Sequence, residues 1–309
     1  MRAVLLFPGQ GAQYAGMGRD LYHEYGVFKR SFNVCADAVS FDLHKACFEG
    51  DGLSGTKILQ PAMYAVSAAT FALLADIGIE PVCCAGLSLG EYAALQAGGA
   101  FGIDSGAIIV EMRGTIMESA VPSGIGGMTA VIGLDAELIE SIIKDIPDVW
   151  TANLISAEQT VVSGSIGALD MAEQAFNDAG AKIIKRLDVS GPFHSPMLGQ
   201  AAQYFLQGVQ ALDIRTPGIE VYSNVKGAPY EQTDDIKSLL SRQICTRVLW
   251  AQTMPLLAQA QAEAVIEAGP GGVLSKLLKK QLKQLFVDRQ VFTVQNCEDI
   301  GKLREWMKR

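Results

Sequence analysis

The sequence has only three histidines and six cysteines among 309 residues, and the cysteines do not have the spacing of a metal site. The adjacent Cys83 and Cys84 would point to opposite faces of a strand, where they could not readily form a disulfide bond. We therefore expect reduced cysteines in the core, no metal site and no cofactor.

Long apolar runs and an excess of basic residues are also missing. We find no stretch of about 18 apolar residues, the length that a membrane span needs. The apolar run at the N-terminus ends at Pro8-Gly9 and is too short for a signal peptide. The net charge of -8 argues against extensive nucleic-acid binding. These absences predict a cytoplasmic protein with no membrane or nucleic-acid partner, and a monomer is the default expectation.

The composition is that of a chain with a large core, since 49% of the residues are hydrophobic and 19% are charged. Basic residues gather in two segments, Lys182 to Arg186 and Ser275 to Lys283. A solvated face is one interpretation of these segments. A docking surface for an acidic partner protein is the other.

Strand-like and helix-like segments alternate along most of the chain. An alanine-rich helix is expected over 63–79, with Pro61 at its start, where the missing N–H costs nothing. Short apolar runs predict strands over 3–7, 81–86, 219–223 and 264–267. Such alternation indicates an α/β fold with a largely parallel sheet.

Three glycines within Gly124-Ile125-Gly126-Gly127 predict a domain boundary. The segment that follows has the pattern β-α-β-β-α-β, which is the order of a ferredoxin-like unit. We therefore predict a large α/β-hydrolase-like domain formed by residues 1–123 and 193–309. A small ferredoxin-like α+β domain, residues 124–192, is inserted in it.

Gly86-Leu87-Ser88-Leu89-Gly90 is a G-x-S-x-G sequence between a predicted strand and a predicted helix. In that context such a turn projects a serine hydroxyl outward. The glycines allow the sharp turn, and the N-terminus of the helix directs its N–H groups at a developing oxyanion. The pattern predicts that Ser88 is a nucleophile, and a structural turn is the alternative.

A serine nucleophile needs a general base, and the chain offers only His23, His44 and His194. His23 and His44 lie beside charged residues in helix-like segments, as expected of solvated surface groups. His194 lies in a loop where the predicted domains meet, and clefts commonly form at such junctions. It is the expected base by elimination and by position, and a histidine without a catalytic role is the alternative.

With these residues in place, the chain resembles the malonyl-CoA:acyl carrier protein transacylases and the related acyltransferase domains of polyketide synthases. The resemblance covers essentially the whole length. The matching motifs are Phe7-Pro8-Gly9-Gln10-Gly11, Gln60-Pro61-Ala62, Gly86 to Glu91, Glu111-Met112-Arg113-Gly114, Phe193-His194-Ser195, Arg242-Gln243 and Glu267-Ala268-Gly269-Pro270-Gly271.

The resemblance implies catalytic roles for the residues at matching positions. Ser88 is then the nucleophile and His194 its base. The histidine is oriented by the main-chain carbonyl of Gln243 instead of a carboxylate, and a carbonyl can fix the tautomer equally well. The backbone N–H groups of Gln10 and Leu89 form the oxyanion hole.

The resemblance also implies how the substrate binds. Arg113 pairs with the free carboxylate of the malonyl group, which a guanidinium can hold through two parallel hydrogen bonds. Phe193 resembles the aromatic residue of malonyl-specific members and would crowd a methyl branch on the substrate. Asn153 is a substrate-binding position in the wall of the cleft.

The activity implied is ping-pong transfer from malonyl-CoA to the phosphopantetheine thiol of holo acyl carrier protein, supplying fatty-acid synthesis. The chain departs from the family at three positions. Leu87 stands where most members have histidine, and Ile155 and Ala157 stand where asparagine and proline are usual. The cleft wall near 155–157 is therefore expected to contact substrate or carrier differently.

Three alternatives stay open. A trans-acting acyltransferase of a polyketide synthase would share every residue named above, and only the carrier would separate it. An acyl-thioester hydrolase would discharge the acyl-serine to water. A non-catalytic carrier-binding module is disfavoured, because nucleophile, base and carboxylate anchor are all present.

Overall fold

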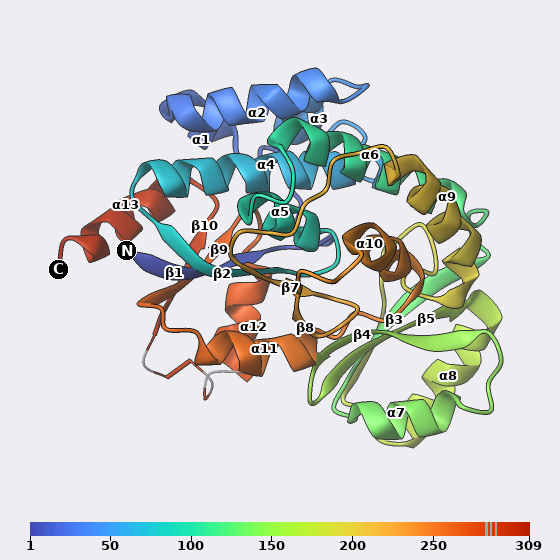
Figure 1. The fold of residues 1–309 in the computed structure, drawn as a ribbon. Helices are drawn as coiled ribbons and strands as arrows, with labels where there is room; N and C mark the ends of the chain where they lie inside the picture. The colour runs from blue at the N-terminus through green and yellow to red at the C-terminus, as the bar shows by residue number, and fades with distance from the viewer. Residues whose placement is uncertain (282–283, 285, 288) are drawn as a thin grey trace.

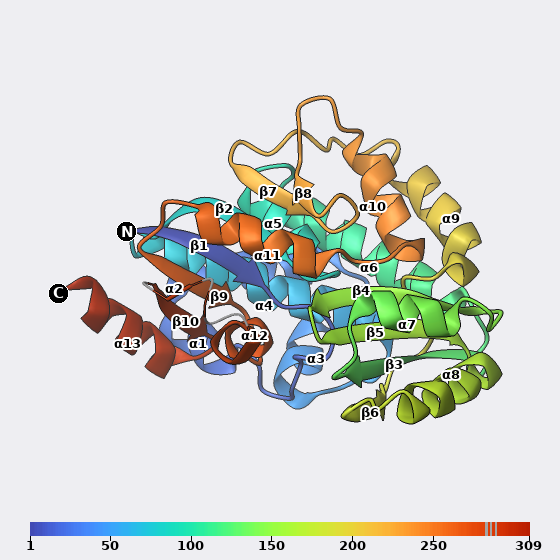
Figure 2. The same ribbon diagram turned by 90° about the horizontal axis from the view of Figure 1, so that it is seen from below.

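The structure is a computed structural model that describes residues 1–281, 284, 286–287 and 289–309. It contains two β-sheets (Figures 1 and 2). The larger sheet has the order β10-β9-β1-β2-β7-β8, in which only β8 runs antiparallel to its neighbour. Its strands are β1 (Arg2–Phe7), β2 (Glu80–Gly86), β7 (Glu220–Ser223), β8 (Ala228–Pro229), β9 (Ala264–Ala268) and β10 (Gln290–Val294).

Helices cover both faces of this sheet, with α4, α5 and α6 on one side and α11 and α12 on the other (Figure 1). This covering explains why β1 is apolar from Ala3 to Phe7 and why all of β9 is buried, because strands in the centre of a parallel sheet are buried on both faces. The helices that cover the faces are α4 (Thr56–Asp76), α5 (Gly90–Ala97), α6 (Ile103–Ser119), α11 (Trp250–Gln259) and α12 (Val273–Gln281).

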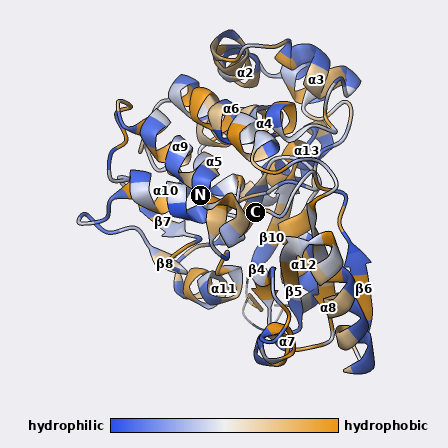
Figure 3. Cartoon of the chain, turned by 90° about the vertical axis from the view of Figure 1, so that its right-hand side faces the viewer, coloured by the Kyte–Doolittle hydropathy of each residue, from blue (hydrophilic) through white to orange (hydrophobic). Residues whose placement is uncertain are grey.

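The remaining helices of this part pack around that core. They are α1 (Arg19–Glu24), α2 (Gly26–Ala38), α3 (Leu43–Glu49), α9 (Gly199–Val209), α10 (Ile236–Cys245) and α13 (Cys297–Met307). A short 3₁₀ helix, Pro196–Leu198, precedes α9. Hydrophobic residues gather along α4 and α6, which pack against each other (Figure 3).

Helix α4 departs from two predictions. It begins at Thr56, so Pro61 lies inside the helix and not at its start. An interior proline costs about 3 kcal/mol, and burial of every side chain from Leu59 to Thr70 offsets that cost. By length and composition α4 could also cross a membrane, so the prediction that no stretch is long enough is wrong. Within the protein, however, 78% of its apolar 18-residue stretch is buried, as in a core helix.

The second sheet is antiparallel, with the order β4-β5-β3-β6. Helices α7 and α8 pack on one face of it (Figure 1). They enclose a separate apolar cluster that includes Val131 and Phe176. The elements follow the predicted β-α-β-β-α-β order as β3 (Gly126–Ile132), α7 (Ala136–Ile143), β4 (Val149–Ser156), β5 (Gln159–Ser165), α8 (Ile166–Asp178) and β6 (Ile183–Arg186).

Strand β4 joins this sheet to the rest of the chain. Leu154 N donates to the carbonyl of Val248 at 2.9 Å, and Val248 N donates to the carbonyl of Ala152 at 2.8 Å. Because Val248 lies just before α11, these bonds hold β4 against the part of the chain that carries the larger sheet. Residues from both sheets can therefore line one cavity.

Candidate active site

Ser88 lies in the turn between β2 and α5 with φ at 52°, a left-handed conformation that non-glycine residues rarely adopt. The flanking glycines serve close packing. A Cβ on Gly86 would lie 1.9 Å from the carbonyl carbon of Gly90, and one on Gly90 would lie 2.1 Å from the carbonyl oxygen of Phe7. Side chains at these two positions would clash, so the glycines allow the sharp turn, as predicted, while the strained residue within the turn is Ser88 itself.

His194 faces Ser88 from a loop more than 100 residues further along the chain. Its Nε2 lies 2.7 Å from Ser88 Oγ, and its Nδ1 lies 2.7 Å from the carbonyl oxygen of Gln243. A carbonyl can only accept, so the ring proton belongs on Nδ1 and leaves Nε2 free to accept the serine proton. His194 also has a left-handed φ of 59°, and strained backbone of this kind clusters at functional sites.

The environment keeps His194 uncharged. The residue is only 4% exposed, and this burial, together with the charge of Arg113, lowers the pKa of its imidazole to about 3. The hydrogen bond to Gln243 opposes the shift. A neutral imidazole at physiological pH is in the form that can take a proton from Ser88.

Arg113 projects from α6 and is 1% exposed. Its guanidinium donates to Gln60 Oε1 at 2.7 Å, to Gln243 Oε1 at 2.9 Å and to Ser88 Oγ at 3.1 Å. Its central carbon lies 5.2 Å from the centre of the Tyr92 ring. Within the described part of the chain it forms no ion pair with a carboxylate, so a buried cation stands beside the nucleophile with only neutral partners.

A cavity of about 90 Å³ opens beside Ser88. It brings together all the predicted site residues except Gln243, whose contribution is the carbonyl behind His194. The residues that line it are Gly9, Gln10, Leu87, Ser88, Leu89, Arg113, Met117, Met128, Asn153, Leu187, Val189, Phe193 and His194. The small volume suits a short acyl group.

Two details of the lining bear on its chemistry. Ser88 donates its own N–H to Asn224 Oδ1 at 2.6 Å, so an oxyanion at this site depends on other amides, and Gln10 and Leu89 both border the cavity. Asn153 Oδ1 is buried and has no hydrogen-bond partner among the described residues. It is an acceptor that a ligand N–H could satisfy.

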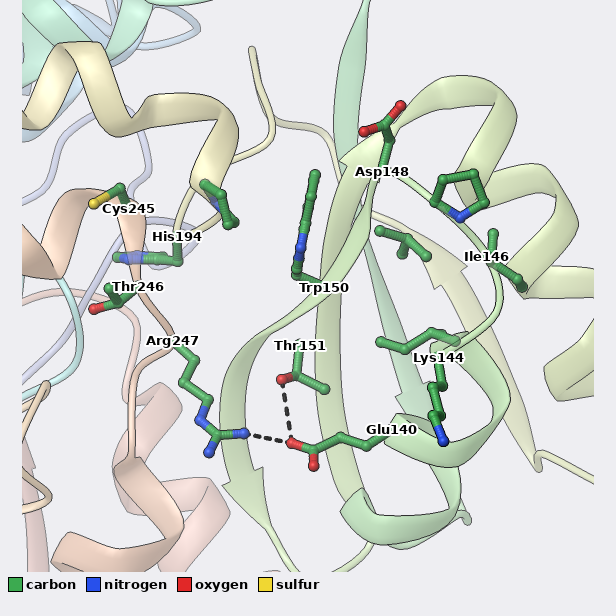
Figure 4. A pocket seen from close by; sticks show the side chains of 14 residues that line it. Glu140, Lys144, Ile146, Asp148, Trp150, Thr151, His194, Cys245, Thr246 and Arg247 are labelled. Carbon is green, nitrogen blue, oxygen red and sulfur yellow. Dashed lines mark hydrogen bonds and ion pairs between the residues drawn. The ribbon is translucent and has the colours of Figure 1, made fainter.

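A larger cavity of about 610 Å³ lies on the other side of His194, between β4 and the segment after α10 (Figure 4). Trp150 and Glu140 form one wall, and His194 and Thr246 form the other. Arg247 reaches across and pairs with Glu140. Volume alone would select this cavity, but the nucleophile and the buried cation border the smaller one.

Glu91, Gln60 and Asn224 also contribute to the site, although the sequence alone indicates no role for them. Asn224 Nδ2 donates to the carbonyl of Gly86 at 2.8 Å, so its side chain fastens both ends of the β2 to α5 turn. A polar residue directly after a strand of a parallel sheet is a signal that could have identified Asn224, because ligand sites form at the carboxyl ends of such strands. Gln60 and Glu91 lie in motifs of the family, but the residues that they contact are distant in the sequence.

The other two histidines lie elsewhere. His23 is exposed, as predicted. His44 is half-buried in an aromatic cluster, with Nε2 3.0 Å from Asn33 Oδ1 and 3.2 Å from Tyr22 Oη. The expectation that His44 is a solvated surface group is therefore wrong, because the packing of α1, α2 and α3 encloses it.

The basic segments differ in how far their charges are neutralised. Arg186 pairs with Asp170 at 2.8 Å and Glu173 at 2.7 Å, and Lys182 lies 3.5 Å from Glu158. In the second segment the lysines on α12 are exposed, and its last two residues, 282 and 283, lie outside the described residues.

Comparisons with known proteins identify the family. The family model "Acyl transferase domain" matches residues 4–308. The chain is 36% identical over 290 residues to the malonyl CoA-acyl carrier protein transacylase of Bacillus subtilis, covering 92% of each chain. It superposes on that of Clostridium perfringens with a TM-score of 0.94 and 32% identity, covering 100% and 98% of the two chains.

A further solved structure shows a malonyl-transacylase in complex with its holo type II PKS acyl-carrier protein. It matches with a TM-score of 0.92 and 30% identity, covering 99% of each chain. The match to the family model and the sequence identity over nearly the full length of these relatives together show the family. The chain belongs to the acyl transferase domain family and, within it, to the malonyl CoA-acyl carrier protein transacylases.

Proposed function

We propose that this protein transfers a malonyl group from malonyl-CoA to the phosphopantetheine thiol of holo acyl carrier protein. The observation that carries the proposal is Arg113, a buried guanidinium 3.1 Å from Ser88 Oγ with no carboxylate partner in the described part of the chain. An acyl group that itself ends in a carboxylate would supply that partner while its thioester faces Ser88. The relatives' names support the same reaction.

In the first half-reaction His194 Nε2 takes the proton of Ser88 as Oγ attacks the thioester carbonyl. The carbon–sulfur bond then breaks, and the coenzyme A thiolate takes the proton back from His194. The backbone N–H groups of Gln10 and Leu89 stabilise the oxyanion, each contributing about 3 kcal/mol in the transition state.

In the second half-reaction the phosphopantetheine thiol gives its proton to His194 and attacks the malonyl-serine ester. The ester bond breaks, and Ser88 Oγ recovers its proton from His194. Arg113 holds the carboxylate throughout, and no metal or cofactor takes part. A thioester and an oxygen ester are close in energy, so the transfer is reversible. The main task of the site is therefore to keep water from hydrolysing the malonyl-serine ester.

The other predicted residues act on selectivity. Phe193 is 4% exposed and borders the cavity beside His194, where it would crowd a methyl branch on the middle carbon of the acyl group. Asn153 Oδ1, which lacks a partner among the described residues, would accept an N–H of the pantetheine arm. We expect malonyl to be preferred over methylmalonyl.

The two sheets support a division of the chain into two domains. The antiparallel order β4-β5-β3-β6 supports a small ferredoxin-like domain over residues 124–192. Residues 1–123 and 193–309 then form the α/β-hydrolase-like catalytic domain. We also propose that the enzyme is a cytoplasmic monomer with no nucleic-acid partner.

A polyketide role is the second candidate, and the observation that favours it is the match to the malonyl-transacylase bound to a type II PKS acyl-carrier protein. The chemistry is the same for both carriers. The rate of transfer to a fatty-acid carrier protein, compared with the rate to a polyketide carrier protein, would separate the two roles.

The test is intact-protein mass spectrometry after brief mixing with malonyl-CoA, followed by addition of holo acyl carrier protein. We expect a malonyl-sized adduct that is absent in Ser88→Ala and that moves to the carrier. An adduct lost only to water would instead indicate a hydrolase. If wild type formed no adduct, the protein would be a carrier-binding module and the proposal would fail.

A further inference from the structure

Glu91 is a buried carboxylate that the proposed mechanism does not use. It lies in the first turn of α5, three residues after Ser88, and is 1% exposed. Its Oε1 accepts from Asn224 N at 3.2 Å and from the Tyr230 hydroxyl, and its Oε2 accepts from Gln243 Nε2. Burying a carboxylate is costly unless it is hydrogen-bonded, and these donors meet that cost.

The side chain of Gln243 joins Glu91 to the substrate anchor. Its Nε2 donates to Glu91 and to the carbonyl of Ser88, the latter at 2.9 Å, while its Oε1 accepts from Arg113 at 2.9 Å. One amide group, fully buried, thus contacts the acid, the nucleophile's backbone and the guanidinium. Its main-chain carbonyl is separately occupied by His194.

The chemistry at each end allows only one orientation of this amide. If the amide were flipped, its NH₂ group would face the guanidinium of Arg113, and its oxygen would face the carboxylate of Glu91. Both contacts would be repulsive. An ionised Glu91 therefore directs the oxygen of Gln243 toward Arg113, and that contact in turn fixes where the guanidinium lies.

The same arrangement balances charge. Arg113 has no direct carboxylate partner in the described residues, and a buried cation is costly without a nearby negative charge. Glu91 supplies that charge from the far side of the Gln243 amide. The amide keeps the two charges apart, so the guanidinium is compensated and still has donors left for an incoming carboxylate.

We propose that Glu91, acting through the side chain of Gln243, is a positioning residue that holds Arg113 ready for the substrate carboxylate. The inference rests on the proposed function. It assigns to Glu91 and Gln243 a part in the selectivity of the site for malonyl over acetyl. Glu91 itself touches no reacting atom. Its loss should therefore weaken recognition of a carboxylate more than it weakens acyl transfer as such.

The test compares malonyl with acetyl transfer from coenzyme A to the carrier in Glu91→Gln. A glutamine can still accept from Tyr230 and Asn224, but its NH₂ would face the NH₂ of Gln243 and favour the flipped amide. We expect the ratio of kcat/KM for malonyl to kcat/KM for acetyl to fall about tenfold or more, with the acetyl value within about threefold of wild type.

Two further variants keep the test decisive. Gln243→Met breaks the link from the other end but keeps the main-chain carbonyl for His194, so it should lower the ratio similarly even if Glu91→Gln folds poorly. Tyr230→Phe is the matched control, because it removes a hydrogen bond to Oε1 of Glu91 and leaves the contact with Gln243. Because the Tyr230 hydroxyl also helps to keep Glu91 ionised, this comparison is made at alkaline pH, where the ratio of Tyr230→Phe should stay within about twofold of wild type.

Equal losses for malonyl and acetyl in Glu91→Gln and Gln243→Met would show a merely structural role and overturn the inference. An unchanged ratio in folded variants would do the same. Failure of the proposed function is a different result, because wild type itself would then form no malonyl-serine.

Discussion

In the proposed mechanism Arg113 distinguishes a malonyl from an acetyl thioester, and replacing it with alanine removes that group. The side chain donates to Gln60, Gln243 and Ser88 and has no ion-pair partner in the described part of the chain. A bound carboxylate therefore gains a charge-assisted contact that an acetyl group cannot make. Arg113→Ala should lower malonyl transfer and spare acetyl transfer.

The size of the effect follows from the burial of the pair. Hydrogen bonds to charged groups contribute about 1.5–3 kcal/mol, and each 1.36 kcal/mol changes a rate about tenfold. Malonyl transfer in Arg113→Ala should thus fall roughly 10- to 100-fold. Arg113→Lys should recover only part of this loss, because an ammonium keeps the charge but not the two parallel donors.

The assay measures kcat/KM for transfer from malonyl-CoA and from acetyl-CoA to the same holo carrier protein. Acetyl transfer serves as the internal control for folding, since it needs Ser88 and His194 but no carboxylate anchor. If malonyl and acetyl transfer fell by the same factor, Arg113 would be a structural residue and the anchor role would be refuted.

Two further predictions concern the turn and the pH dependence. Asn224→Ala should slow formation of malonyl-serine and of acetyl-serine by a similar factor, as measured by rapid-mixing mass spectrometry. The substitution removes hydrogen bonds to the backbone of Gly86 and Ser88 and leaves the contacts of Arg113 unchanged. A loss confined to malonyl-serine would contradict this prediction. Burial raises the pKa of Glu91 to about 7. Hydrogen bonds from Tyr230, Gln243 and Asn224 and the charge of Arg113 oppose this rise. Tyr92 is a further titratable group near Glu91. Protonation of Glu91 below about pH 7 should therefore lower the malonyl-to-acetyl ratio of kcat/KM in wild type but not in Glu91→Gln. His194, with a pKa of about 3, remains neutral over this range. A wild-type ratio that did not change from pH 8 to pH 6 would contradict this prediction.

The sequence predicts most of the fold because strand and helix patterns are local. The apolar run over 3–7 and the G-x-S-x-G turn each depend on neighbouring residues, and β1, β2 and α5 lie where these patterns place them. The start of α4 was predicted wrongly because the local rule for Pro61 is overridden by burial of the whole helix. Burial through tertiary packing cannot be predicted from the residues of a short segment alone.

The site divides in the same way. Ser88 and His194 can be found from a motif and from the scarcity of histidines. Arg113 could be assigned only through the family resemblance, because an arginine in a helical pattern is usually exposed, and its burial depends on partners 53 and 130 residues away in the sequence. The contacts of Glu91 arise in the same manner, from three segments that meet only in the folded chain.

In the proposed mechanism, recognition of the carboxylate and activation of Ser88 are coupled through the charge of Arg113. After burial, the charge of Arg113 is the main cause that lowers the pKa of His194 and so weakens it as a base. A malonyl carboxylate bound to Arg113 offsets that charge, so the correct substrate strengthens the base that acts on it. Acetyl-CoA brings no carboxylate and leaves the base weakened. In Arg113→Ala the suppression is gone, so acetyl transfer should be retained or rise, and a rise would not follow from the loss of the carboxylate contact alone.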